Sequence, residues 1–237
     1  MDSEEKIVVW TISLDQPVEI VEQCYESLPA KERAKADRYK VEPARRAFVL
    51  ARWALRAKLA ERLECKPLGI HFRYGEYDKP YLAEPATCGL GFNVSHSGDW
   101  AMVAIGPFEV LGVDIERLRQ VNNLDSLART VFCQEELEKW LNETEELRPE
   151  HLFRKWTQKE ACLKATGVGL STPMTKLSVK EDGGRLLLDA PSGPIMDANP
   201  WALQTFSHLD CYFVSLALGK CSDLPEVIFQ KFDFTSG

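Results

Sequence analysis

The sequence predicts an α+β fold divided into two lobes. Strand-like segments, rich in β-branched and aromatic residues, alternate along the 237 residues with two longer segments in which apolar residues recur at helical spacing. A chain of this length can form two small lobes and still bury a core in each. The turn-forming pair Gly106-Pro107 separates two strand-like segments. We therefore predict an N-terminal lobe of residues 1–106 and a C-terminal lobe of residues 107–237.

Local spacing and turn residues define the elements of the N-terminal lobe. The spacing predicts a helix over 43–63, because Pro43 suits a first helical turn and apolar residues follow it at helical intervals. A shorter helix is predicted over 30–39. Residues 75–89 are predicted to form a loop, since prolines and polar residues dominate them. Strands are predicted over 7–14, 70–74, 91–95 and 100–105.

The C-terminal lobe is predicted to contain a long helix over 149–166. Gly167 and Gly169 follow it, as is common where a helix ends. A shorter helix is predicted over 134–141. Short strands separated by turns are predicted over 110–115, 176–179, 185–188, 201–206, 211–218 and 227–229.

Composition excludes several classes of protein. The chain has no run of about 18 apolar residues, so we expect no membrane span. Residues 1–6 lack the basic start and apolar run of a secretory signal, which predicts a cytoplasmic protein. The seven cysteines are scattered without a C-x-x-C pair, which favours reduced thiols over disulfides or a zinc cluster.

Charge is distributed unevenly along the chain. The net charge is −7, yet residues 31–62 hold eleven Lys or Arg against four Asp or Glu, a local charge of +7. A basic segment in an acidic protein indicates contact with an anion, although a solvated helix face has the same composition. Nucleic acid is not the expected partner, because the protein as a whole is acidic.

A strand over 110–116 would place two carboxylates on one face. Side chains alternate along a strand, so Asp114 and Glu116 share a side with Gly112, which allows a close approach. Neighbouring carboxylates repel unless a cation lies between them, and oxygen ligands of this kind suit Mg²⁺. A polar edge strand facing solvent would show the same pattern.

The predicted helix over 149–166 carries a second group of charged residues. Trp156, Glu160 and Lys164 lie one above another at a spacing of four, and Lys159 lies on the adjoining face. Glu160 and Lys164 in this order can form an ordinary surface ion pair worth roughly 0.2–0.5 kcal/mol. A carboxylate beside a lysine is also what metal-assisted phosphoryl transfer uses.

Residues 92–99 place serines beside His96. A Ser-His catalytic pair is not favoured, because adjacent strand residues point in opposite directions and no G-x-S-x-G turn is present. We predict instead a polar loop that offers hydroxyl, imidazole and backbone donors to a phosphate.

The three motifs together resemble those of the phosphopantetheinyl transferases. They are Asn-x-Ser-His-Ser at 93–97, Gly-Val-Asp-Ile-Glu at 112–116, and Trp-x-x-Lys-Glu-Ala-x-x-Lys-Ala-x-Gly-x-Gly-Leu at 156–170. The strong match spans 92–171. The length and two lobes resemble the larger, monomeric surfactin-type branch. The third motif resembles its subclass with Trp and Lys-Glu-Ala, which is often broad in its carrier proteins.

The resemblance implies a pair of pseudo-symmetric α/β lobes, each with a small antiparallel sheet packed against a long helix. The active site would be the cleft between them. Asp114, Glu116 and Glu160 would hold Mg²⁺ together with the pyrophosphate of coenzyme A, beside Lys164. The other contacts to coenzyme A that the resemblance implies are Lys31, Arg46, Lys79, Ser95, His96 and Lys159.

The resemblance also implies the reaction. The enzyme would transfer 4′-phosphopantetheine from coenzyme A to a serine of an apo acyl or peptidyl carrier protein and release 3′,5′-ADP. Glu160 would be the general base, Lys164 would stabilise the departing phosphate, and Asp114 would complete the catalytic group. The same residues also fit two other functions, a Mg²⁺-dependent phosphohydrolase and a non-catalytic coenzyme A-binding module. The sequence does not identify which carrier proteins are modified.

Overall fold

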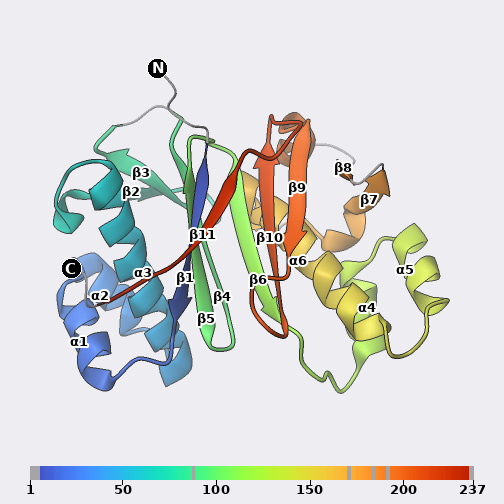
Figure 1. Ribbon diagram of the computed structural model, residues 1–237, viewed down its shortest axis with the longest axis horizontal. Helices are drawn as coiled ribbons and strands as arrows, with labels where there is room; N and C mark the ends of the chain where they lie inside the picture. Colours follow the sequence, from blue (N-terminus) through green and yellow to red (C-terminus); the bar gives the residue numbers. More distant parts are fainter. Residues whose placement is uncertain (1–5, 87–88, 170–171, 183–184, 191–192, 235–237) are drawn as a thin grey trace.

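The computed structural model describes residues 6–86, 89–169, 172–182, 185–190 and 193–234. Two β-sheets pack against each other through a shared cluster of apolar side chains. Each sheet carries one long helix on its outer side, α3 (Glu42–Arg62) on the first and α6 (Arg148–Thr166) on the second (Figure 1). The predicted α+β fold with a long helix against each small sheet is confirmed.

The first sheet has the strand order β11-β1-β5-β4. Strand β5 pairs antiparallel with β1 and β4, whereas β11 pairs parallel with β1. The last strand of the chain therefore completes the sheet built by the first half. The division at residue 106 stays a prediction. The bounds of the strands are β1 (Ile7–Ser13), β4 (Gly91–Ser97), β5 (Trp100–Gly106) and β11 (Val227–Lys231).

Helix α3 covers the outer face of the first sheet. Leu55 and Leu59 are fully buried against a core that includes Ile12 and Val103 of the sheet. Helices α1 (Val18–Glu26) and α2 (Ala30–Ala36) lie beside α3, and a hairpin of β2 (His71–Tyr74) and β3 (Pro80–Glu84) follows it (Figure 1).

The second sheet has the order β6-β10-β9, and all its pairs are antiparallel. Its strands are β6 (Leu111–Arg117), β9 (Trp201–Phe206) and β10 (Tyr212–Gly219). Helix α6 packs on it, and Ala161 and Leu163 of α6 are fully buried there. The remaining elements are α4 (Leu124–Val131), α5 (Gln134–Leu141), β7 (Ser178–Asp182), β8 (Arg185–Asp189), α7 (Pro194–Asp197) and the short 3-10 helices η1 (Pro67–Gly69) and η3 (Met174–Lys176). No helix among the described residues is long and apolar enough to cross a membrane.

Strands β4 and β6 are the neighbouring edges of the two sheets, and side chains join them. Three side chains at alternate positions of β4 accept hydrogen bonds from N–H groups at alternate positions of β6. Residues at i, i+2 and i+4 of a strand point to the same side, which explains the spacing. We call this set the side-chain ladder. Its pairs and N···O distances are Asn93–Val113 (3.1 Å), Ser95–Ile115 (3.3 Å) and Ser97–Arg117 (3.1 Å).

The predicted strand over 91–95 is confirmed, whereas two predicted loops are wrong. Residues 92–99, also predicted as a polar loop, belong mainly to strand β4, which turns at Gly98 into β5. Their serine hydroxyls serve the side-chain ladder, so their polarity does not indicate a loop. The predicted loop over 75–89 contains β3, which begins at Pro80.

Helix α6 approaches β6 most closely at Gly112. A Cβ atom at this position would lie 2.0 Å from the Ala161 carbonyl oxygen and 2.6 Å from the Ala165 amide nitrogen. Only a residue without a side chain therefore lets the helix backbone rest on the strand. This contact brings the charged residues of α6 beside Asp114 and Glu116.

We predict that Gly112→Ala lowers the free energy of unfolding by about 2–3 kcal/mol, because the added methyl group must push α6 off the sheet. Chemical denaturation checks this. Gly69→Ala is the matched control, since a Cβ there meets nothing within 4 Å, and we expect it to stay within about 0.5 kcal/mol of the parent. Equal stability of the two variants would contradict the tight contact.

Candidate active site

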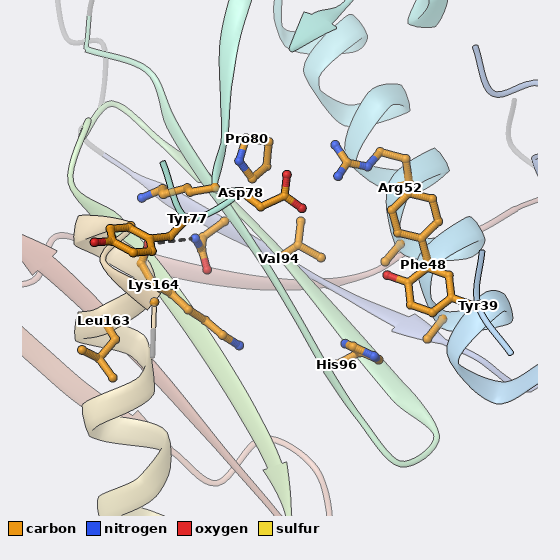
Figure 2. A pocket seen from close by; sticks show the side chains of 16 residues that line it. Tyr39, Phe48, Arg52, Tyr77, Asp78, Pro80, Val94, His96, Leu163 and Lys164 are labelled. Atoms are coloured by element: carbon orange, nitrogen blue, oxygen red, sulfur yellow. Dashed lines mark hydrogen bonds between the residues drawn. The ribbon is translucent and has the colours of Figure 1, made fainter. Parts of the chain in front are cut away.

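A cavity of about 260 Å³ opens where the two halves of the molecule meet (Figure 2). Its walls are the N-terminal half of α3, the turn between β2 and β3, strand β4 and the C-terminal end of α6. Tyr39 and Phe48 form an aromatic wall on the α3 side, with their ring centroids 5.5 Å apart. A largely apolar hollow with a few polar groups is typical of a small-molecule site.

Basic side chains enter this cavity from different elements. Lys79, His96 and Lys164, all singled out from the sequence, line it together with Arg52 of α3. Arg52 Nη1 is buried without a hydrogen-bond partner, and the nearest carboxylate oxygen, Glu32 Oε1, is 3.7 Å away. A buried charged donor without a partner is costly, so the cavity is suited to an anion.

Asp114 is the centre of a buried polar group at one side of the cavity. Its Oδ1 accepts hydrogen bonds from Ser95 Oγ at 2.8 Å and from Lys164 Nζ at 2.5 Å, and Lys164 also donates to Ser95 at 2.7 Å. Its Oδ2 is buried and has no partner among the described residues. Burial raises the pKa of Asp114, while Lys164 opposes that change. An ion pair joins β6 to α6 at this point.

Glu116 and Glu160 belong to the same electrostatic group. Glu116 accepts hydrogen bonds from Ser97 at 2.9 Å and Arg119 at 3.2 Å. Burial raises the pKa of Glu160 to about 7, and the nearby charges of Asp114 and Glu116 add to this effect. Glu160 therefore has a proton affinity suited to exchanging a proton near neutral pH.

Burial also changes the proton affinity of the cavity's basic groups. Lys79 is nearly buried, and its Nζ donates to the carbonyl oxygens of Ala165 at 2.5 Å and Leu111 at 3.4 Å. Burial lowers the pKa of Lys79 to about 8. Burial and the neighbouring Lys164 lower the pKa of His96. The imidazole is thus expected to be neutral near pH 7 and able to donate one hydrogen bond.

The donor set fits a divalent cation that is completed by its ligand. Within the described residues, no three His, Cys, Asp or Glu side chains are gathered closely enough to hold a metal by themselves. Mg²⁺ commonly takes only one or two carboxylates, with phosphate oxygens and waters completing its shell. Asp114 Oδ2 has no hydrogen-bond partner among the described residues, so it is the oxygen available to such an ion. Glu116 and Asp114 both lie near enough to Glu160 to raise its pKa.

Two of the residues predicted to contact coenzyme A, Ser95 and Lys159, do not line the cavity. Ser95 points to β6 and not into the cavity, because it is on the opposite side of the strand from His96, and its hydroxyl serves Asp114 and Lys164. Lys159 is fully buried on another side of α6. Its Nζ binds Glu136 at 2.5 Å and the carbonyl oxygens of Val131 and Met174 at 2.7 and 3.2 Å. Lys159 therefore anchors α6 to its neighbours.

Two further predicted contacts lie outside the cavity lining. Arg46 Nη1 donates to the Gln16 carbonyl oxygen at 2.5 Å, and Lys31 is exposed on α2. Arg52, which sequence reasoning missed, lines the cavity on the α3 side instead. Its only sequence signal was its place in the basic segment at 31–62. Leu170, the last residue of the third motif, lies outside the described residues.

An apolar cavity lined by cationic side chains thus lies next to three carboxylates that influence one another electrostatically. Two family models match adjacent stretches of the chain. The 4′-phosphopantetheinyl transferase superfamily model covers 110–208, and a model of the N-terminal region of 4′-phosphopantetheinyl transferases covers 15–107.

Curated relatives agree with the family models. The 4′-phosphopantetheinyl transferase HetI of Nostoc sp. is 36% identical over 168 residues, which are 70% of this chain and 71% of that protein. The 4′-phosphopantetheinyl transferase Sfp of Bacillus subtilis is 27% identical over 224 residues, which are 93% of this chain and 95% of that protein. The chain belongs to the 4′-phosphopantetheinyl transferase superfamily and is an enzyme of that class.

A solved structure overlaps part of the chain. The holo-[acyl-carrier-protein] synthase of Thermotoga maritima covers 47% of this chain with a TM-score of 0.40 and 23% sequence identity. This chain spans 63% of the length of that one. A TM-score of this size supports no inference about the site.

We predict that Lys159→Met lowers the free energy of unfolding by about 3–5 kcal/mol, because it leaves Glu136 as a buried charge without its cation. Denaturant titration measures the loss. Lys139→Met is the control, since Lys139 pairs with Glu135 at an exposed site and such pairs are worth about 0–1 kcal/mol. A Lys159→Met protein that is as stable as the control but binds coenzyme A poorly would restore the original prediction for Lys159.

Proposed function

We propose that the cavity binds coenzyme A and that Asp114, Glu116 and Glu160 bind Mg²⁺ against its pyrophosphate. The enzyme then transfers 4′-phosphopantetheine to a serine of an apo acyl or peptidyl carrier protein and releases 3′,5′-ADP. One observation carries the residue roles. The motifs at 112–116 and 156–170, which are far apart in the sequence, meet at Asp114 and Lys164. Their charged atoms are 2.5 Å apart, and Glu160 lies beside them.

The cavity's chemistry supports an extended nucleotide ligand. Lys164 lies at its α6 side, and Tyr39, Phe48 and Arg52 lie at its α3 side (Figure 2). Lys164 in turn pairs with Asp114, next to Glu116 and Glu160. The pyrophosphate belongs with the first group, because a divalent ion can bridge carboxylates and phosphates. The adenosine 3′-phosphate and base belong with the second group, where aromatic rings and the Arg52 guanidinium, whose Nη1 makes no hydrogen bond, are present.

The reaction is an in-line substitution at the β-phosphorus of coenzyme A. The serine oxygen forms a bond to this phosphorus, and the bond from the phosphorus to the oxygen bridging the two phosphates breaks. Glu160, beside Asp114 and Lys164, takes the serine proton. Lys164 offsets the charge that develops on the leaving 3′,5′-ADP. When bound, Mg²⁺ supplies Lewis-acid polarisation of the pyrophosphate.

The subclass of the enzyme and its range of carrier proteins are proposed from sequence motifs and charge. The motif at 156–161 supports the subclass with Trp and Lys-Glu-Ala and a broad range of carrier proteins. The basic segment at 31–62, with Lys31, Arg38 and Lys40 exposed, supports docking of an acidic carrier surface. A monomeric state in the cytoplasm, without nucleic-acid or membrane partners, stays a prediction.

We predict that Glu160→Gln reduces carrier modification at least about 100-fold, because the amide cannot accept the serine proton. Mass spectrometry of an apo carrier protein measures this as loss of a shift of about 340 Da. Glu138→Gln on α5, outside the site, is the control and should retain full activity. Phosphate release without any carrier would favour the phosphohydrolase. Unchanged transfer by Glu160→Gln would exclude Glu160 as the base.

We predict that coenzyme A binds about tenfold more weakly at pH 9 than at pH 7, because a lysine with a pKa of about 8 loses most of its charge over this range. Affinity falls as the pH rises because the anionic ligand binds the protonated, positively charged form of Lys79 more tightly. Isothermal titration calorimetry of the parent and of Lys79→Arg checks this, since arginine stays charged throughout. An equally steep pH dependence in Lys79→Arg would exclude Lys79 as the titrating contact.

A further inference from the structure

Glu116 is held less tightly by its own strand than Asp114, its neighbour on the same face of β6. Asp114 lies in the middle of the strand, and both Ser95 and Lys164 bind its carboxylate. Glu116 is the last residue but one of β6 and has a longer, more flexible side chain. That side chain is 17% exposed, against 3% for Asp114. The orientation of Glu116 therefore depends on the residues that bind its carboxylate.

Two donors bind the same oxygen of Glu116. Ser97 Oγ donates to Oε2 at 2.9 Å, and Arg119 Nη1 donates to Oε2 at 3.2 Å. Within the part of the chain that the structure describes, no hydrogen bond reaches the other oxygen, Oε1. An ionised carboxylate can accept at both oxygens. The two donors thus fix one oxygen in direction and leave the second to a further ligand.

Arg119 is itself held in place by groups on both β6 and α6. It follows the end of β6, and its guanidinium turns back so that Nη1 also donates to the Arg117 carbonyl oxygen at 3.4 Å. Its Cζ lies 5.1 Å from the ring centroid of Phe153, a fully buried residue of α6. A planar guanidinium over an aromatic ring has a defined orientation. Arg119 therefore links the position of α6 to the orientation of Glu116.

The charge of Arg119 and its geometry have opposite effects on a cation at this site. A positive charge near the ion weakens binding, but the side chain of Arg119 is 48% exposed, so salt and water screen that charge. A partner that orients a ligating carboxylate strengthens binding, and its loss typically costs about 10- to 100-fold in metal affinity. Arg119 also offsets the repulsion between Glu116 and Asp114. The geometric effect is therefore expected to be the larger one.

We propose that Arg119 is a positioning residue for Mg²⁺: it fixes one oxygen of Glu116 and leaves the other to the ion. This proposal rests on the proposed function, and it adds a residue that lies outside all three sequence motifs. Arg119 acts on a ligand of the ion and not on the reacting atoms. Its loss should therefore weaken binding of the ion without slowing the transfer once the ion is bound.

The test compares the full chain with Arg119→Ala and Arg119→Lys. Mn²⁺ is titrated into each protein saturated with coenzyme A, and the free ion is measured by its electron paramagnetic resonance signal. Arg117→Ala is the matched control, because the Arg117 side chain is 49% exposed and pairs with Asp99 at 3.3 Å instead of with Glu116. It removes the same charge from a neighbouring position. Thermal denaturation checks that all variants fold.

For Arg119→Ala we expect Mn²⁺ to bind about tenfold more weakly. For Arg119→Lys we expect a loss of about threefold, because an ammonium keeps the charge but not the planar geometry. Arg117→Ala should stay within about twofold of the parent. Carrier modification by Arg119→Ala should need about tenfold more Mg²⁺ for its half-maximal rate, while its rate at saturating Mg²⁺ stays within about twofold of the parent.

Other results would overturn the proposal. Unchanged or tighter Mn²⁺ binding by Arg119→Ala would mean that Arg119 contributes only a surface charge. An equal loss in Arg117→Ala would mean that any cation at the end of β6 has this effect, and full affinity in Arg119→Lys would mean that orientation does not matter. A low rate of Arg119→Ala at saturating Mg²⁺ would mean that Arg119 acts on the transfer itself. If the parent protein with coenzyme A retains no Mn²⁺, the proposed function itself fails, which is a distinct outcome.

Discussion

The side-chain ladder between β4 and β6 is the interaction on which the site depends. Three β4 side chains, Asn93, Ser95 and Ser97, accept N–H groups of β6 and fix the edges of the two sheets against each other. Ser95 also binds Asp114 and Lys164, and Ser97 binds Glu116. The groups that join the halves of the molecule therefore also position its carboxylates. Because Asn93, Ser95 and Ser97 meet these N–H groups only in this register, a shift along the strands would leave several buried polar groups unpaired.

Helix α6 depends on the same junction. It rests on β6 at Gly112, and this contact places Glu160 and Lys164 beside Asp114. Burial makes this arrangement electrostatically sensitive, since three carboxylates share a region of low dielectric with one lysine. An incoming cation and diphosphate would relieve that repulsion. Apolar packing of α6 and the buried Lys159–Glu136 pair, on another side of the helix, hold α6 beside these carboxylates.

Sequence reasoning was most reliable where function depends on local spacing. Asp114 and Glu116 lie on one face of β6, and the α6 motif carries Glu160 and Lys164, because strand and helix periodicities fix both. It did not foresee that Lys159 is buried against Glu136, since tertiary packing decides which face of α6 the neighbouring helices cover. Arg52 could not be told apart from the other basic residues of its segment. The Asn-x-Ser-x-Ser spacing at 93–97 carried a signal for the side-chain ladder, but only the adjacency of β4 and β6 gives that spacing its meaning. The short helix α1 (Val18–Glu26) was missed, although Ile20, Val21, Cys24 and Tyr25 recur at helical spacing and pack into the core.

The most direct test is to locate the divalent ion. Crystals grown with coenzyme A and Mn²⁺ in place of Mg²⁺ would show the ion by its anomalous scattering. A single strong peak in ligand contact with Asp114 and with Glu116 or Glu160, next to the pyrophosphate, is the expected result. A peak elsewhere, or coenzyme A bound with its pyrophosphate away from these carboxylates, would contradict the account.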